Sequence, residues 1–239
     1  MLSACACLTS LPRIAKASFV LNTNNTSGWT VTRTTSSATQ SNADYLSLPY
    51  DGTPTTKAAV LITADPNWTA SNDSRLSSAK WISDSASSGS SSGDPFSTRY
   101  VYKASFTLAQ ASNLKAVFAA DNIVDKVIFS SAADGAGTVF GTFTNAVLPI
   151  GDQDSGPPGR IYGFRLDSVQ SLNLTASGTV FVTATSYNYS GPPVAGHPVS
   201  NGSSYGFIMS VDATAVPEPV SAAILGVPAA LLLLRRRKS

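Results

Sequence analysis

Cysteine and histidine are almost absent from this sequence of 239 residues. Its two cysteines, Cys5 and Cys7, lie within the first seven residues, and its one histidine is His197. A body without cysteine excludes a disulfide framework, a cysteine-ligated zinc site and a cysteine nucleophile. One histidine alone gives no familiar zinc set, and we interpret His197, next to a proline, as a solvated loop residue.

Charge is scarce as well, because charged residues make up 13% of the chain against about 25% in typical soluble domains. Between residues 17 and 216, ten basic residues stand against thirteen aspartates, so this stretch carries a net charge of about −3. The chain has no cluster of basic residues outside its C-terminal tail, which argues against a nucleic-acid partner. Serine, threonine, asparagine and glycine are abundant instead, and 43% apolar residues still allow a core.

Catalytic motifs are also missing, since no serine has the setting of a nucleophile elbow. Asp121 with Asp125, and Asp152 with Asp154, are the close aspartate pairs. We expect the first pair to cap a turn, while the second, in GDQDSG, lacks the further acidic positions of a calcium loop. A surface hydrolase would need a carboxylate pair converging in a cleft. The sequence therefore predicts a body that is not an enzyme and holds no metal or cofactor.

What dominates the interior is the alternation of a β-strand. In residues 100–108, apolar and polar side chains alternate, as in a half-buried antiparallel strand. Similar patterns recur in residues 113–121, 125–129, 159–166, 171–176, 178–187 and 204–213. No stretch shows helical periodicity, and turn-rich segments at 83–95 and 189–204 indicate surface loops. The pattern predicts an all-β domain, a sandwich of two antiparallel sheets.

The N-terminus has features of an export leader. Ala15-Lys16-Ala17 fits a signal-peptidase site before Ser18, but the basic residues follow the apolar run instead of preceding it. We interpret residues 1–17 as the end of a longer leader whose start lies upstream. The alternative is the N-terminus of a cytosolic protein.

The C-terminus has three parts in a fixed order. They are the motif Val216, Pro217, Glu218 and Pro219, an uncharged and mostly apolar span at 220–234, and a basic block of Arg235, Arg236, Arg237 and Lys238. Glu218 is the only glutamate of the chain. Fifteen uncharged, mostly apolar residues with flanking arginines predict a transmembrane helix, and the positive-inside rule places the basic block in the cytoplasm. The two prolines hold the motif extended, so it neither joins the preceding domain nor lengthens the span.

This tripartite end resembles the PEP-CTERM sorting signal of Gram-negative bacteria. The resemblance implies recognition by an exosortase, a membrane-embedded transpeptidase that cuts at or near the Pro-Glu-Pro. It also implies an exported protein that resides in the inner membrane transiently and then reaches the cell surface or extracellular matrix. An ordinary single-pass tail anchor is the alternative.

A second resemblance covers about 150 residues of the body. DPNWTASN, AKWIS, the strand at 100–108, LKAVFAADNIVDKVIF and GFIMSVDA follow one another in an order similar to the galactose-binding-like jelly-roll sandwich. Where that family has a compact turn after DKVIF, this chain has SSAADGAGTVFGTF, which leaves the loop geometry and any transferred ligand site open. We predict a leader segment at 1–17, a β-sandwich domain at 18–212 and the sorting signal at 213–239.

Two functions follow from these features. The first is a non-catalytic surface or matrix protein that is sorted and processed through its tail. The alternative is a carbohydrate-binding module that tethers the cell to exopolysaccharide, because exposed aromatic rings stack on sugar rings. Its candidate contacts are Trp68, Tyr187 and Tyr189, whereas Trp81, beside a strand, is expected in the core.

Overall fold

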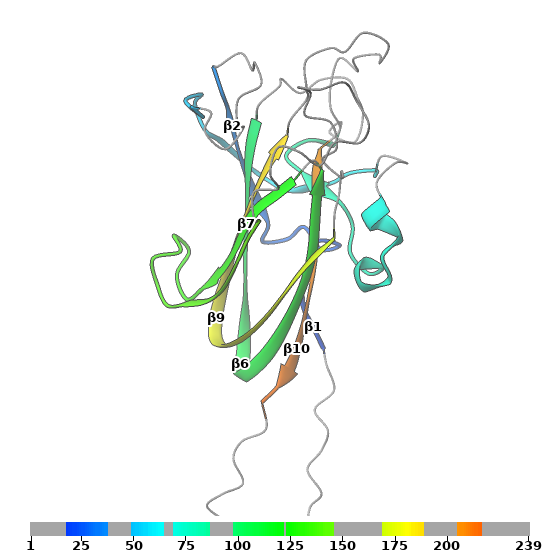
Figure 1. The fold of residues 1–239 in the computed structure, drawn as a ribbon, viewed down its shortest axis with the longest axis vertical. Helices are drawn as coiled ribbons and strands as arrows, with labels where there is room; N and C mark the ends of the chain where they lie inside the picture. Colours follow the sequence, from blue (N-terminus) through cyan, green and yellow to red (C-terminus); the bar gives the residue numbers. More distant parts are fainter. Residues whose placement is uncertain are drawn as a thin grey trace, which may run out of the picture.

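The computed structural model describes residues 18–37, 49–64, 69–86, 98–121, 123–145, 169–188 and 205–216, and these form an all-β fold (Figure 1). Every strand pair in these residues is antiparallel. The predicted fold class is therefore confirmed at the level of all-β. The strands are β1 (Ser18–Asn22), β2 (Thr30–Thr35), β3 (Thr55–Ala58), β4 (Val60–Leu61), β5 (Ile82–Ser83), β6 (Thr98–Asp121), β7 (Ile123–Ser130), β8 (Val139–Thr144), β9 (Gln170–Asn188) and β10 (Gly206–Ala215).

Helical structure in the described residues consists of two 3-10 turns, η2 (Thr69–Asn72) and η3 (Ser74–Leu76), and one 3-10 residue at Ala86. None of the helices in this part of the chain is long and apolar enough to cross a membrane. The predicted span at 220–234, the leader at 1–17 and the strand predicted at 159–166 lie outside the described residues.

Two long strands, β6 and β9, pair along nearly their whole length and bend together. Residues 98–108 of β6 pair with 178–188 of β9, and residues 112–118 pair with 170–176. The register shifts between Leu108 and Ser112, so β6 has three residues where β9 has one. Opposite this shift, Gly178 has a φ of 68°. Each strand was predicted as two shorter ones, and the predicted break falls at this bend.

The two halves of this bent ribbon carry different neighbours, which gives two layers (Figure 1). The N-terminal half of β6 pairs with β2, and β2 with β3, while β9 pairs with β7 and β7 with β8. The C-terminal half of β6 pairs with β10, which in turn pairs with β1 and β5. We call the first group, with residues 98–108 of β6 and 178–188 of β9, the β7 layer. We call the second group, with residues 112–121 of β6 and 170–176 of β9, the β10 layer.

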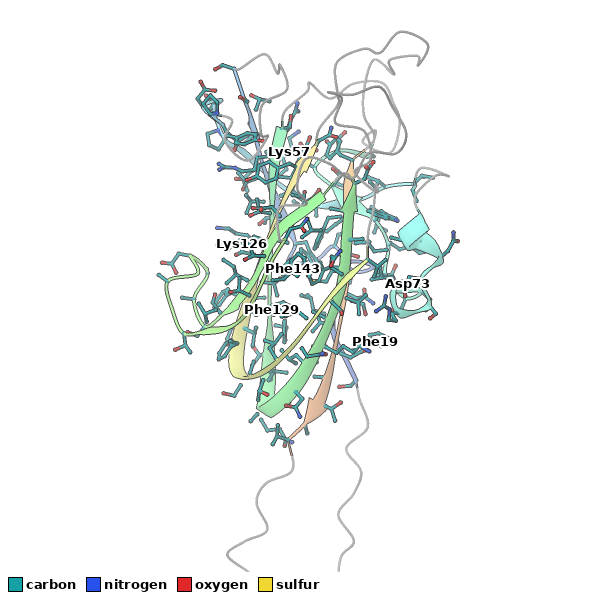
Figure 2. The ribbon with its side chains drawn as sticks, viewed as in Figure 1. Phe19, Lys57, Asp73, Lys126, Phe129 and Phe143 are labelled. Carbon is teal, nitrogen blue, oxygen red and sulfur yellow. The ribbon has the colours of Figure 1, made fainter. Side chains whose placement is uncertain are left out.

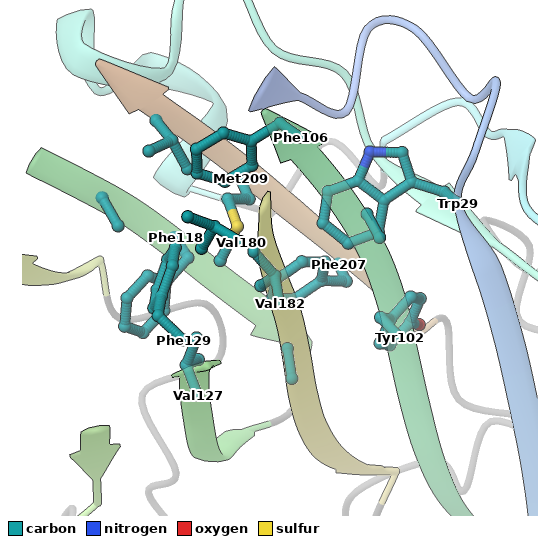
Figure 3. Packing of buried hydrophobic residues seen from close by; sticks show 14 of the residues in the cluster. Trp29, Tyr102, Phe106, Phe118, Val127, Phe129, Val180, Val182, Phe207 and Met209 are labelled. Carbon is teal, nitrogen blue, oxygen red and sulfur yellow. The ribbon is translucent and has the colours of Figure 1, made fainter. Parts of the chain in front are cut away.

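The main core lies between the two layers, and aromatic rings meet across it (Figure 3). Tyr102 of β6 stacks on Phe207 of β10 with ring centroids 4.8 Å apart, and Trp29 contacts the same phenylalanine at 5.9 Å. Phe118 meets Phe143 of β8 edge-on at 5.1 Å. The alternation in the sequence correctly identified the inward faces of β6, β9 and β10, because these residues belong to the core cluster.

A second, smaller core covers part of the outer face of the β10 layer. Leu76 and Trp81, from the segment around η3 and β5, pack with Val117, Ala119 and Ile208. The indole N–H of Trp81 donates to Ser71 Oγ at 2.8 Å. The prediction that Trp81 is a core residue is confirmed.

Three local features differ from expectation. The stretch after β7 forms a β-hairpin with β8, although no strand was predicted there. β10 continues to Ala215, three residues past the predicted domain boundary, because its pairing with β6 continues to Ser112. Ser83, the first residue of a predicted loop, belongs to β5.

Candidate functional site

The predicted sorting motif begins where the backbone hydrogen bonds of β10 end. Val216, the first motif residue, donates its N–H to the carbonyl of Ala111 at 2.9 Å. The described residues stop there, so Pro217, Glu218, Pro219 and the basic block at 235–238 lie outside them. No linker residue separates the fold from the motif.

The two ends of the described body lie side by side. β1 runs antiparallel to β10, with Ser18 opposite Ala213 and Asn22 opposite Ser210. In Figure 1 the start of β1 and the end of β10 lie at the same end of the molecule, where β6 and β9 bend. β1 therefore begins at the residue that follows the predicted leader, next to the strand that leads into the motif.

One predicted sugar contact, Tyr187, lies within the described residues. Its ring is 8% exposed and packs on Tyr50 at 5.2 Å, and the guanidinium of Arg99 lies 5.3 Å from the Tyr50 ring centre. Trp68 and Tyr189 lie outside the described residues, so the proximity of the three predicted contacts stays a prediction.

The candidate acidic residues are only partly described. Asp121 is buried at the end of β6, and Asp125 lies at a register shift in β7, where its carbonyl accepts from Asn145 at 2.7 Å. Asp152, Asp154 and His197 lie outside. Within the ranges described, no three His, Cys, Asp or Glu side chains are grouped so as to hold a metal ion.

A buried polar cluster lies between the layers at the far end from the chain ends. The phenol of Tyr205 donates to the carboxyl of Asp84, and Tyr205 stacks on Tyr100 at 4.3 Å. Burial raises the pKa of the adjacent Tyr102 well above its ordinary value, and the charges of Tyr205 and Asp84 raise it further. The hydroxyls of Ser83 and Ser186 act in the opposite direction. Because these groups are enclosed, we regard the cluster as part of the fold.

The uncovered half of the outer face of the β10 layer forms a groove of about 500 Å³. This volume is within the range of about 300–1,000 Å³ that is usual for small-molecule sites. The lining residues come from neighbouring strands: Asn113, Leu114 and Lys115 of β6, Asn173, Leu174 and Thr175 of β9, and Asp212 and Thr214 of β10.

The pairing register aligns these side chains in rows across the strands. Asp212 lies opposite Lys115, and Lys115 lies opposite Asn173. Phe19 of β1 lies opposite Asp212 and so extends the same row by one strand. Directly opposed residues of an antiparallel pair project from the same face. Phe19 therefore stands beside the groove, on the face that the groove occupies.

Phe19 is also unusual in its exposure. Its side chain is 61% exposed, and the other large hydrophobic residues classed as exposed in the described part of the chain, Leu61 and Val139, are aliphatic. Figure 2 shows Phe19 at the margin of the molecule. An exposed aromatic ring thus adjoins a groove whose lining includes one cation, one carboxyl group, two amides and two leucines.

A second row of the groove is held by a hydrogen bond between strands. Thr214 lies opposite Asn113, and Asn113 opposite Thr175. The hydroxyl of Thr175 donates to Asn113 Oδ1 at 2.8 Å. This bond uses the amide oxygen of Asn113 and leaves its two N–H donors for other partners.

Sequence reasoning missed the groove because its residues are the ordinary polar positions of alternating strands. One sequence feature could have indicated the groove. Along the outward face of β6, polar Asn113 and Lys115 give way to apolar Val117, and along that of β10, Ile208 is apolar and Asp212 polar. That change marks where the cover ends. Comparisons of the chain with protein-family models, with curated proteins and with solved structures find no match.

Proposed function

We propose that this chain is an exported surface or extracellular-matrix protein that is sorted and processed through its C-terminal signal. The observation that carries the proposal is the order of Pro217-Glu218-Pro219, an apolar span and a basic block, placed directly after the last hydrogen bond of the fold. The partner is an exosortase-type transpeptidase, and the inner membrane holds the chain during sorting. The body is non-catalytic.

The position of the motif supports this route in physical terms. Three residues lie between Val216 and Val220, so at about 3.3–3.6 Å for each of the four steps the folded body ends within about 15 Å of the span. Prolines at 217 and 219 keep the intervening backbone out of both the sheet and a helix. A transpeptidase at the membrane face would therefore meet an extended segment with a folded domain on one side.

Mass spectrometry of the mature protein from a bacterium that has such a transpeptidase tests the proposal. We expect a C-terminus at or near residues 217–219 and loss of residues 231–234. Replacing Pro217 and Pro219 with alanine should leave the tail uncut and the protein in the membrane. Pro228→Ala, within the span but outside the motif, is the matched control and should be processed normally. A mature protein that still contains residues 231–234 would contradict the proposal.

For the body we propose a galactose-binding-like jelly-roll sandwich, supported by its antiparallel strands and by the core between two layers. Carbohydrate binding is the second candidate function, and the exposed Phe19 beside a groove with both polar and apolar lining favours it. Both functions are compatible, since a protein sorted to the matrix meets polysaccharide there.

A further inference from the structure

We propose that the groove on the β10 layer binds an uncharged oligosaccharide chain, with Phe19 as the platform for one sugar ring. The proposal rests on the carbohydrate-binding candidate and is independent of the sorting route. It assigns the contact to a sheet face near the chain ends, instead of to the aromatic residues that the sequence suggested.

The length of the row fits a chain of sugars better than a single sugar. Phe19, Asp212, Lys115 and Asn173 stand on four adjacent strands, in the order β1, β10, β6 and β9. With neighbouring strands about 4.8 Å apart, the row is about 14 Å long. Among the described strands, β1 pairs only with β10, and residues 170–176 of β9 pair only with β6, so the row runs from one edge of this layer to the other.

The polar side chains match the hydroxyl groups of a sugar. Asp212 accepts hydrogen bonds, Lys115 donates them, and the amides of Asn113 and Asn173 do both. Because Asp212 and Lys115 are directly opposed, adjacent hydroxyls can donate to the carboxylate and accept from the ammonium. The single positive and negative charges balance, which favours an uncharged ligand over an acidic one.

The arrangement of cover and groove supports a site more than a merely solvated face. On the same strands and the same face, Val117 and Ile208 are apolar and packed under the segment around η3. Asn113 and Lys115, further along that face of β6, are polar and exposed. A solvated edge does not require a large exposed aromatic ring, yet Phe19 stands at the end of the row. An aromatic ring beside planar amides is the combination that an oligosaccharide, with its apolar ring faces and polar edges, would need.

The test measures binding of the full-length chain, in a detergent without a sugar headgroup, to cellohexaose, mannohexaose and an alginate hexamer by isothermal titration calorimetry. We expect binding to a neutral hexasaccharide that exceeds binding to alginate. Phe19→Ala, Lys115→Met and Asn173→Ala should each weaken it about tenfold, the size expected for loss of one good contact. All three side chains are exposed, and thermal unfolding checks that each variant remains folded.

Lys103→Met is the matched control because Lys103 is an exposed lysine of the same strand that lies in the β7 layer half of β6. It should bind like the parent. Three results would each overturn the proposal. They are a chain that binds neither cellohexaose nor mannohexaose, a chain that binds alginate more tightly than both, and groove variants that bind as tightly as the parent. Binding that persists in the groove variants would leave the carbohydrate-binding candidate standing and exclude this site.

Discussion

The phenol of Tyr102 is fully buried, and its raised pKa couples the stability of the fold to alkaline pH. Above about pH 10 the unfolded chain releases this proton while the folded chain retains it, so stability falls as pH rises. Tyr102→Phe removes this contribution, and its free energy of unfolding should decline less steeply than that of the parent between about pH 9 and pH 11. Urea unfolding at both pH values measures the difference. Phe106→Leu, a core change without a proton, should lower both values equally, and an unchanged slope in Tyr102→Phe would contradict the prediction.

At the scale of the element, the alternation of apolar and polar residues in β6 and β9 predicted which side chains face the core, but not that each is one long strand. Phe106, Leu108 and Leu114 all point to the core on both sides of the bend, because the bend turns each half of β6 toward the same interior. The inward residues were therefore predicted correctly, while the fusion of the predicted strands was not. Whether two short strands are separate or joined depends on the pairing with a partner strand, which local periodicity does not contain.

The groove was unpredictable for a related reason. A polar residue on the outer face of a strand has the same local pattern whether it lies in open solvent or beside an aromatic ring from another strand. Phe19 and Asp212 are neighbours only through the pairing of β1 with β10, across most of the chain. By contrast, Trp81 could be identified as a core residue because its setting beside a strand is local.

The bend itself offers a test of how β9 turns. Gly178 has a φ of 68°, and a Cβ added there would meet no atom within 4 Å, so a side chain would cost backbone strain without a clash. Gly178→Ala should lower the free energy of unfolding by about 1 kcal/mol, and Gly178→Asn by less, because asparagine tolerates the left-handed region. Denaturant unfolding measures both. Ser177→Ala, at the exposed neighbouring position, should change little. Equal stability of Gly178→Ala and the parent would contradict this role.

At the scale of the whole molecule, the fold is completed by joining its first strand to its last. β1 pairs with β10, and the next residue, Thr23, exchanges hydrogen bonds with Met209: its N–H donates to the Met209 carbonyl at 3.0 Å, and its hydroxyl accepts from the Met209 N–H at 3.2 Å. The end of the molecule next to the predicted sorting motif thus depends on residues that directly follow the predicted leader. A body that has not yet paired β1 would present an open edge of β10 next to that motif.

Two chains that differ only in β1 test this dependence. Compared with a chain that begins at Ser18, one that begins at Thr23 lacks β1 and leaves that edge of β10 without a partner there. Because an unpaired edge and a partly uncovered core favour association, we expect a lower unfolding temperature and concentration-dependent aggregation. Differential scanning calorimetry and light scattering measure the two effects. If both chains unfold at the same temperature and remain monomeric, the prediction that β1 stabilises the fold would be contradicted.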